Sequence, residues 1–365
     1  MISRKQMTKR IAVTGGAGFV GSNLACMIAR EHPGCSVVAL DNLKRRGSEL
    51  TLSRLAAASV EFLHGDVRIE SDLAALGAVD CLIECSAEPS VLAGQDGAPG
   101  YVLDTNLTGA LNCLEHLRRQ GGEMIFLSSS RVYYIPALTN LPLEERGDRL
   151  EITEGAAGPG WSDAGIAESF STAGPRSLYG ATKLAAEQFI EEYRAAYELR
   201  AVVYRCGVLT GPWQMGKVDQ GVITLWLARH LFGGTLAYIG HGGDGRQVRD
   251  LLHVADLYDL IAPRLDGIGA EDGQTYNVGG GMANSVSLRE LTRHCERLTG
   301  NTLAIDAVPE TRANDIGYYV TDNAKAETRT GWRPKRTLEE TLEDIHRWLV
   351  DNRAQLEPIL KGDGT

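Results

Sequence analysis

Short apolar runs alternate with longer segments of helical periodicity through the first half of the chain. The apolar runs are about five residues long, the usual length of a β-strand. They predict strands over 10–14, 36–40, 60–64, 80–84, 124–128 and 201–206, with helices such as 20–30, 102–119 and 179–197 between them. Such alternation predicts an α/β fold with a doubly wound parallel sheet, the Rossmann type, covered by helices on both faces.

The alternation is interrupted once and then becomes irregular. Residues 135–177 are rich in Gly, Pro, Ser and acidic residues and lie between a predicted strand and a strong helix, so they form an insertion. This insertion either closes over a site or is a plain surface loop. We expect a first domain over 1–205 and a smaller C-terminal mixed α/β domain over 206–248 and 279–365. Within 249–278, the segments 249–256 and 275–278 are predicted to return to the first sheet, and 338–352 to form an amphipathic terminal helix.

Composition narrows the class of protein further. The formal net charge of −10 disfavours a nucleic-acid coat or a binder of anionic membranes, which are usually basic. No apolar run reaches the roughly 18 residues of a membrane span, and the basic N-terminus has no apolar signal region. The seven scattered Cys residues lack zinc-site spacing and predict reduced thiols, a cytoplasmic location and no metal.

Three glycines mark the first candidate site. Gly15, Gly18 and Gly21 follow the first predicted strand and open the first helix, with Phe19 and Val20 between the last two. Glycine permits a tight turn and lets backbone N–H groups approach a pyrophosphate, which binds at the helix N-terminus. The strand–turn–helix context therefore predicts a dinucleotide cofactor.

Acidic residues at the ends of the next two strands suggest which dinucleotide binds. Asp41 lies 20 residues after Gly21, where a carboxylate accepts hydrogen bonds from the adenosine ribose and repels a 2′-phosphate, which favours NAD over NADP. The basic residues 44–46 could nevertheless receive a 2′-phosphate. Asp66 and Val67, after the third strand, either meet the adenine edge or, in the case of Asp66, cap a helix.

Candidate catalytic groups lie on the third long helix and at the end of the fifth strand. Tyr179 and Lys183 are four residues apart and share one helix face. An ammonium beside a phenol lowers the pKa of the phenol, so that the tyrosine can act as a base toward a sugar hydroxyl. The serines at 128–130 end a strand at the carboxyl edge, where ligands bind in open α/β sheets, although such serines are also common caps.

Taken together, these motifs resemble the extended short-chain dehydrogenase/reductase family, from Ile11 to about Leu349. The matching stretches are 14–21, 41–43, 65–67, Asn106 with Gly109, 128–133, 179–183 and 249–256. The resemblance implies a Rossmann domain that binds NAD and a C-terminal domain that binds a nucleotide-diphosphate sugar. It implies a catalytic triad of Ser129, Tyr179 and Lys183, with Ser129 chosen because it lies three residues before Val132.

The resemblance also implies further ligand-binding residues. Asn42, Ala87 and Asn106 are expected to contact the cofactor. Ser130, Arg131, Gln220, Arg249 and Arg312 are expected to contact the substrate. The planar guanidinium suits bidentate phosphate contacts, so Arg249 and Arg312 are the expected pyrophosphate ligands. The alternative is that these two arginines form salt bridges to Asp250 and Asp315.

Further matching stretches within that family are 41–47, 219–222, 245–253, 276–280, 284–285, 287–288 and Arg312 with Asp315. By these stretches the sequence is most similar to the CDP-paratose (CDP-tyvelose) 2-epimerases. The dehydratases of the family carry an acidic pair after the catalytic hydroxyl residue, whereas Ser130 and Arg131 follow Ser129 here. We therefore expect an NAD-dependent nucleotide-sugar epimerase that oxidises its sugar transiently to a keto-sugar and returns the hydride to the opposite face. The alternatives are a nucleotide-sugar 4-epimerase, a net oxidoreductase that releases NADH, and an NAD-binding sensor without activity.

Three departures from the family pattern lie near the expected pocket. They are Tyr134 in place of a glycine, and the stretches 84–88 and 206–209. They leave the sugar, the base and the epimerised carbon open. The helices 102–119 and 179–197 usually build a dimer interface in this family, which predicts a homodimer. The apolar positions Leu107, Leu111, Leu114, Ala186, Phe189 and Ile190 could instead be plain core.

Overall fold

A seven-stranded parallel sheet organises the first part of the molecule. The computed structural model describes residues 9–95, 97–216 and 220–361. The strands are β1 (Lys9–Thr14), β2 (Cys35–Asp41), β3 (Glu61–His64), β4 (Cys81–Glu84), β5 (Glu123–Ser129), β10 (Arg200–Cys206) and β14 (Thr275–Val278). Their order is β14-β10-β5-β4-β1-β2-β3, so the winding reverses between β1 and β4. The predicted doubly wound parallel sheet is confirmed.

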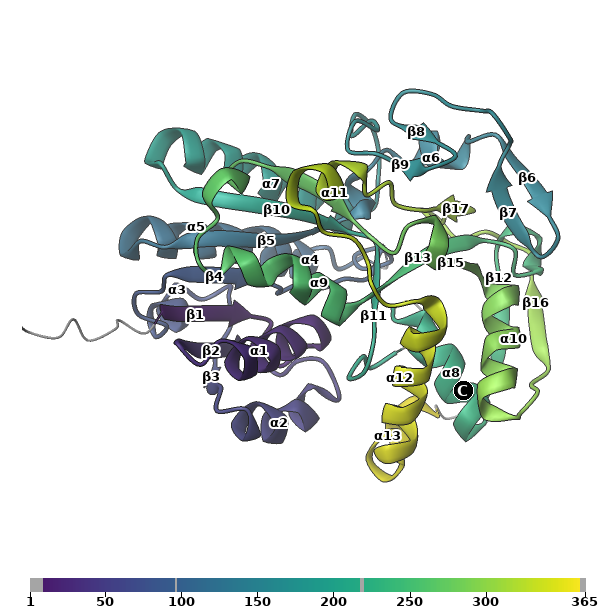
Figure 1. The fold of residues 1–365 in the computed structure, drawn as a ribbon, viewed down its shortest axis with the longest axis horizontal. Helices are drawn as coiled ribbons and strands as arrows, with labels where there is room; N and C mark the ends of the chain where they lie inside the picture. Colours follow the sequence, from purple (N-terminus) through teal and green to yellow (C-terminus); the bar gives the residue numbers. More distant parts are fainter. Residues whose placement is uncertain (1–8, 96, 217–219, 362–365) are drawn as a thin grey trace, which may run out of the picture.

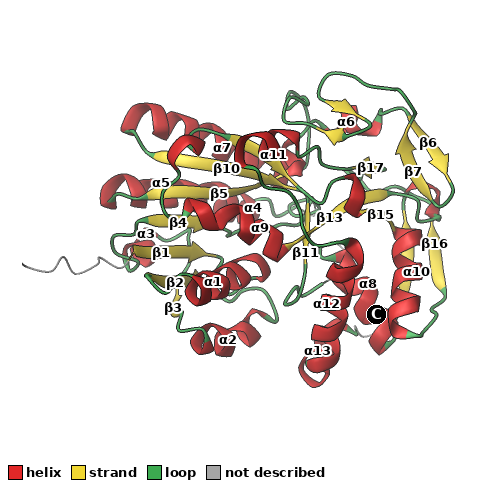
Figure 2. Ribbon diagram, in the orientation of Figure 1, coloured by secondary structure: helices red, strands yellow, loops and turns green. Residues whose placement is uncertain are grey.

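Helices cover both faces of this sheet, as Figures 1 and 2 show. The helices are α1 (Phe19–Glu31), α2 (Leu52–Ala57) and α9 (Val254–Ile261) on one face, and α3 (Glu70–Ala74), α5 (Gly109–Gln120) and α7 (Leu178–Tyr197) on the other. Successive residues of a strand point to opposite faces. Ile11 and Val13 accordingly pack in one apolar core, and Ala12 between them packs in the other.

The helix predicted over 102–119 is present but is not uniform. It begins as α4 (Gly100–Leu103), passes through a π turn over Asp104–Thr108 and continues as α5. Asn106 lies in this π turn, and such turns are frequent at functional sites.

A second group of elements packs beside the carboxyl edge of the sheet. It contains a small sheet in the order β11 (Val208–Thr210), β13 (Val248–His253), β15 (Ser285–Ser287), with β17 (Tyr318–Tyr319) also on β13, and the pair β12 (Leu236–Ile239) and β16 (Ile305–Val308). Its helices are α8 (Val222–Phe232), α10 (Leu288–Thr299), α12 (Leu338–Asp351) and α13 (Arg353–Leu360), while α11 (Ala324–Thr330) packs near β14. The predicted amphipathic terminal helix is α12. It begins with a capping box that Thr337 and Glu340 form. In the described ranges no helix is long and apolar enough to cross a membrane.

One predicted segment is placed differently. The stretch 249–256 was expected to join the large sheet, but β13 pairs with β11, β15 and β17 instead. The place beside β10 is taken by β14, which does return as expected. Leu252 of β13 and the following helix α9 nevertheless pack in the core of the large sheet, where α9 contacts α1. An apolar run predicts a strand, but the strand's partners depend on contacts distant in sequence, so the expectation for β13 was wrong.

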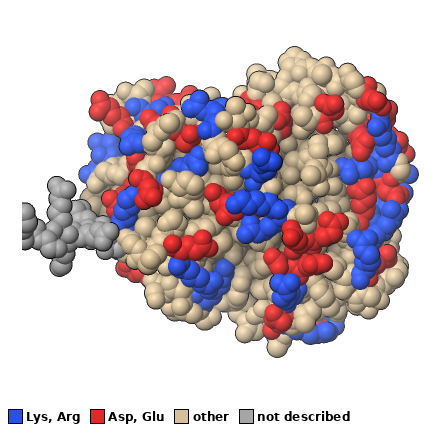
Figure 3. Space-filling view, in the orientation of Figure 1, with Lys and Arg blue, Asp and Glu red and all other residues tan. Residues whose placement is uncertain are grey.

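The insertion packs on the smaller group of elements. It forms α6 (Ile135–Thr139), the hairpin β6 (Leu143–Arg146) and β7 (Arg149–Ile152), and the short pair β8 (Trp161–Ser162) and β9 (Gly165–Ile166). The Leu150 N–H donates to the Arg246 carbonyl at 2.9 Å, and the Ile166 N–H donates to the Val320 carbonyl at 2.8 Å. Basic and acidic side chains alternate along this edge of the molecule (Figure 3), where Asp148 of the hairpin turn pairs with Arg289 and Arg293 of α10.

Candidate functional site

A cavity of about 1070 Å³ lies at the carboxyl edge of the large sheet. Loops after β1, β2, β4 and β5 line it on one side, and β12, β13 and residues 306–315 line it on the other. Ligands of open α/β folds bind at this edge, beside the point where the strand order reverses. No residue of the 135–177 insertion lines the cavity, so the expectation that the insertion closes over the site is not met.

The glycine-rich turn leaves an open cradle at the start of α1. Gly15 has φ +62°, and a Cβ there would lie 2.9 Å from the Cys85 backbone. A Cβ on Gly21 would lie 2.2 Å from the Gly15 carbonyl oxygen, so the helix can approach the turn only without a side chain. Gly18 is the N-cap, and it lines the cavity with Phe19 and Val20. Free backbone N–H groups at a helix N-terminus fit a pyrophosphate.

Asp41 lies in the cavity wall beside this cradle. Its Oδ2 accepts a hydrogen bond from the Ala17 N–H at 3.1 Å, and its Oδ1 accepts one from the Leu43 N–H at 2.7 Å. Burial raises the pKa of Asp41, and these backbone donors oppose the rise. A carboxylate oxygen has two lone pairs, so both oxygens can still accept from a ribose hydroxyl.

Asp66 and Val67 also line the cavity. Asp66 pairs with Arg68 at 2.6 Å and accepts a hydrogen bond from the Asn42 side chain at 2.9 Å. The hydrogen bond from Arg68 lowers the pKa of Asp66 well below its usual range. The N-cap of the following helix is Ile69, so the alternative that Asp66 caps a helix was wrong.

Two of the three cations that could receive a 2′-phosphate are engaged elsewhere. The Lys44 ammonium lies 3.0 Å from the centroid of the Tyr101 ring, a cation–π contact. Arg45 donates to the Met215 carbonyl at 2.6 Å and to Gln220. These contacts, together with Asp41, favour NAD over NADP.

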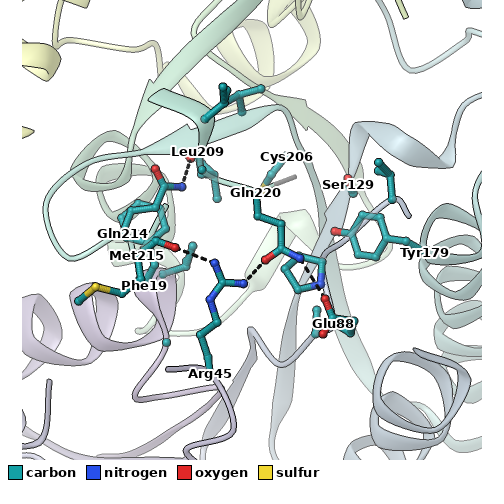
Figure 4. Close-up of a pocket in the computed structure, with 18 of the residues that line it drawn as sticks. Phe19, Arg45, Glu88, Ser129, Tyr179, Cys206, Leu209, Gln214, Met215 and Gln220 are labelled. Carbon is teal, nitrogen blue, oxygen red and sulfur yellow. Dashed lines mark hydrogen bonds between the residues drawn. The ribbon is translucent and has the colours of Figure 1, made fainter. Parts of the chain in front are cut away.

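The candidate catalytic hydroxyl and phenol meet at one end of the cavity. Ser129 ends β5, and Tyr179 lies in the first turn of α7; Figure 4 draws the two side chains on the same side of the cavity. The helix can begin there because Ser177 caps it, accepting from the Gly180 N–H at 3.1 Å. A Cβ on Gly180 would lie 2.0 Å from the Arg131 carbonyl oxygen, so this glycine permits the contact between α7 and the turn after β5.

Ser129 is both a cap and a lining residue. Its Oγ accepts a hydrogen bond from the Arg131 N–H at 3.2 Å, which caps the 3-10 turn over Ser130–Val132. The hydroxyl hydrogen of Ser129 remains available to a ligand in the cavity. Its neighbour Ser128 also lines the cavity, but the Ser128 hydroxyl donates to Glu187, so Ser129 suits the predicted role better than Ser128.

Lys183 is the most buried member of the predicted triad. Its side chain is 2% exposed, and its Nζ lies 3.2 Å from Oε2 of Glu84, which is also 2% exposed. The sequence indicates Tyr179 as the partner of Lys183, but it does not indicate the Glu84 carboxylate. The signal was present, because 84–88 was noted as a departure from the family pattern.

Asn106 does not line the cavity, contrary to the prediction that it contacts the cofactor. Its Oδ1 accepts from the Glu88 N–H at 2.7 Å, and its Nδ2 donates to the Glu88 carbonyl and to the Thr182 hydroxyl. Through these hydrogen bonds, the Asn106 side-chain amide joins the loop after β4 to α7. Ala87, on the same loop, does line the cavity.

The substrate end of the cavity contains three arginines. Arg249 pairs with Asp315 at 3.2 Å. Burial by itself would raise the pKa of Asp315, but the hydrogen bond with His241 and the charge of Arg249 lower this pKa to about 2. The salt-bridge alternative is thus met for this pair. Arg312 is exposed and lines the cavity, and Arg131 donates to the Asn314 carbonyl at 3.1 Å. Ser130 lines the cavity beside Arg131.

Gln220 joins the two sides of the cavity. Its Oε1 accepts from Arg45, and its Nε2 donates to Oε1 of Glu88 at 3.0 Å (Figure 4). The sequence placed Gln220 at the site but did not indicate Arg45 or Glu88 as its partners.

Among the residues that the structure describes, no cluster of three or more His, Cys, Asp or Glu side chains could hold a metal ion.

Comparison with known proteins identifies the family. The model of the NAD-dependent epimerase/dehydratase family matches residues 11–279. The chain belongs to this family. The CDP-paratose 2-epimerase of Salmonella typhi is 28% identical over 93% of this chain and 98% of its own length. The UDP-glucose 4-epimerase of Erwinia amylovora is 28% identical over 94% and 98%, respectively. The dTDP-glucose 4,6-dehydratase DesIV of Streptomyces venezuelae, a double mutant solved with NAD, has a TM-score of 0.77 at 28% identity and covers 96% of this chain and 99% of its own.

Membership in the NAD-dependent epimerase/dehydratase family confirms the predicted family and NAD as the cofactor. Two of the three departures from the family pattern line the cavity. Residues 85–88 and 206–209 are wall residues, whereas Tyr134 packs on Gly174 of the insertion. A Cβ on Gly174 would lie 2.5 Å from the Tyr134 ring. The stretches 85–88 and 206–209 can therefore contact a ligand in the cavity, whereas Tyr134 lies outside the cavity wall.

Proposed function

We propose that this chain is an NAD-dependent nucleotide-sugar epimerase that acts by transient oxidation, with a specificity like that of a CDP-paratose 2-epimerase. One observation carries the proposal. The serine, tyrosine and lysine of the expected triad come together at the cavity, and a serine and an arginine occupy the two positions where dehydratases of the family have acids. A keto-sugar formed there has no adjacent acid at 130 or 131 to drive elimination of water.

The cofactor would lie along the cradle and the first wall of the cavity. Its holders are Gly15, Gly18, Phe19, Val20, Gly21, Asp41, Asn42, Asp66, Val67, Ala87, Tyr179 and Lys183. When bound, NAD accepts the hydride and gives it back. The cradle that a Cβ would fill and the two free lone pairs on Asp41 both suit this ligand.

The chain's own residues would handle the proton and the oxygen. Tyr179 takes the proton from a sugar hydroxyl, and the Lys183 ammonium stabilises the phenolate. Ser129 donates a hydrogen bond to the oxygen that becomes a carbonyl, where the charge develops. The keto-sugar then turns in the cavity before reduction on its other face.

The nucleotide diphosphate would bind at the arginine end of the cavity. Arg249, already oriented by Asp315, and Arg312 are the proposed phosphate ligands. Arg131 and Ser130 lie next to Ser129 and would contact the sugar. Gln220, which bridges the cavity, would contact the sugar or the base.

Native mass spectrometry followed by a substrate screen tests the proposal. We expect the purified protein to carry NAD, and one of the CDP-, UDP-, GDP- or dTDP-sugars to give an epimer without net NADH. A CDP-sugar inverted at C2 is the expected substrate. Inversion at C4 would favour the 4-epimerase, steady NADH release a net oxidoreductase, and bound NAD without any turnover a sensor.

We also propose a homodimer. Of the six apolar positions on the two interface helices, Leu114, Ala186 and Ile190 are core, Leu107 and Leu111 are partly buried, and Phe189 is 42% exposed. Leu103 and Tyr197 add exposed apolar surface to the same helices. Light scattering should report a dimer that Phe189→Glu converts to monomer; an unchanged mass for the variant would argue against this face.

A cytoplasmic location is likewise proposed. All seven cysteines are free thiols, which suits a reducing compartment. Fractionation of the native cells should recover the protein with the cytoplasm, and recovery from the periplasm or medium would contradict this location.

A further inference from the structure

The buried carboxylate behind the triad lysine has no role in the chemistry described above. Glu84 ends β4 and does not line the cavity, whereas Lys183 does. Their side chains meet at 3.2 Å with only 2% of each exposed. Removing two charges from water is costly, and a well-packed apolar pair of similar size would often be as stable. A buried ion pair in this position therefore suggests a role beyond stability.

We propose that Glu84 is a positioning residue that holds the Lys183 ammonium in place and, through its negative charge, sets the pH range in which Tyr179 can accept and return a proton. The proposal rests on the proposed function, because it assigns the working phenol to Tyr179. It goes further by giving the strand-end acid, which the sequence showed only as a departure from the family pattern, a defined effect on that phenol.

Two contacts hold the Lys183 ammonium in place. The Lys183 Nζ lies 4.5 Å from the centroid of the Phe126 ring on β5, so an aromatic face and a carboxylate share the charge. Lys183 is one turn after Tyr179 on α7, so the two side chains lie on the same face of the helix. Displacement of the ammonium toward or away from Glu84 would therefore change the field at Tyr179.

The other titratable groups around the pair carry no charge near neutral pH. They are the thiols of Cys85 after β4, Cys113 on α5 and Cys206 on β10. Burial raises the pKa of all three, that of Cys206 to about 12, so they stay protonated. The charges that act on Tyr179 are thus those of Lys183 and of Arg131, the latter on the turn after β5. Glu84 acts on Tyr179 through its contact with Lys183.

The pair itself favours the charged lysine. Burial disfavours the ammonium, but the Glu84 carboxylate and Tyr179 together raise the pKa of Lys183 above its ordinary value. Burial also raises the pKa of Glu84, and Lys183 opposes that rise. Removing the negative charge should therefore lower the pKa of Lys183, which would lose the carboxylate that favours its ammonium form. It should also lower the pKa of the phenol, because Glu84 would no longer partly offset the positive charge of Lys183.

The test compares Glu84→Gln with Glu84→Asp. The amide keeps the size and removes the charge, while aspartate keeps the charge. We expect Glu84→Gln to shift both limbs of the pH profile of epimerisation downward by about one unit or more, and Glu84→Asp to leave them in place. Limbs that stay within a few tenths of a unit in Glu84→Gln would show that Glu84 only fills space and would overturn the proposal.

A second readout does not need turnover. Ultraviolet titration of the phenolate, taken as the difference between each protein and the same protein with Tyr179→Phe, reports the pKa of Tyr179 directly. We expect the same downward shift in Glu84→Gln, even if no nucleotide sugar turns over and the proposed function fails. Should Glu84→Gln not fold, nitrogen NMR of wild-type protein labelled on lysine, assigned with Lys183→Met, keeps the test open. A charged Lys183 persisting above neutral pH supports the proposal, and a neutral amine near neutral pH overturns it.

Discussion

Arg249 and Asp315 form an ion pair in the wall of the cavity, with Nη2 of Arg249 3.2 Å from Oδ1 of Asp315. The same nitrogen donates to the Ile316 carbonyl at 2.7 Å, and Nη1 donates to the Val248 carbonyl at 2.8 Å. Three acceptors therefore fix the guanidinium before any ligand arrives. A side chain that is already oriented loses little conformational entropy on binding a phosphate.

Arg249→Met should weaken nucleotide-sugar binding more than it slows the chemistry. Loss of charge-assisted hydrogen bonds to the diphosphate should raise KM about tenfold to a hundredfold, with a smaller change in kcat, because these contacts are the same in the ground and transition states. Steady-state kinetics measure both. Arg246→Met is the matched control, since Arg246 pairs with Asp244 and does not line the cavity. An unchanged KM in Arg249→Met would remove this arginine from the substrate site.

Gly180→Ala should impair catalysis without touching a ligand. Its Cβ would meet the Arg131 carbonyl oxygen at 2.0 Å, so the start of α7 must move away from the turn that follows Ser129. We expect kcat to fall at least about tenfold, since small misplacements of catalytic groups are costly. Gly100→Ala, in the first turn of α4 with open space around its Cβ, should keep wild-type kcat. Equal activity in both variants would mean that the approach of α7 to β5 is not required.

The fold, and the grouping of Ser129, Tyr179 and Lys183 at one cavity, could be predicted from local patterns, whereas the long-range partners of these elements and residues could not. The period of the apolar runs and the glycine spacing placed β1, α1 and the glycine-rich turn between them correctly, because each depends on neighbouring residues. The pairing of β13 and the use of Asn106 as a bridge depend on contacts distant in sequence, such as Val248 with Tyr318 and Asn106 with Thr182, which are 70 or more positions apart. Nothing near these positions in the sequence indicates such partners.

Asp41→Ser should relax the choice of cofactor. The carboxylate that favours NAD would be lost, while the basic residues at 44–46 remain. We expect NADH binding to weaken about tenfold and the ratio of NADPH to NADH affinity to rise, which fluorescence titration of both reduced cofactors measures. Asp80→Ser, before β4 at the opposite edge of the sheet, serves as the control. A wild-type preference in Asp41→Ser would assign the discrimination elsewhere.

The insertion should affect stability and leave catalysis alone. Asp148 joins the β6–β7 hairpin to α10 through Arg289 and Arg293, and the hairpin does not line the cavity. Exposed ion pairs contribute at most about 1 kcal/mol each, so Asp148→Ala should fold. Limited proteolysis should cut residues 135–177 faster, while kcat/KM stays within about twofold of wild type. A large fall in kcat/KM would place the insertion at the active site after all.

Turnover in heavy water tests the central claim most directly. If Tyr179 removes a hydroxyl proton and the carbon-bound hydrogen leaves and returns as hydride, the inverted carbon keeps its own hydrogen. Mass spectrometry and proton NMR of the epimer formed by the enzyme should then show no solvent deuterium at that carbon. Deuterium there would mean that the carbon was deprotonated beside a carbonyl, and it would contradict epimerisation by transient oxidation.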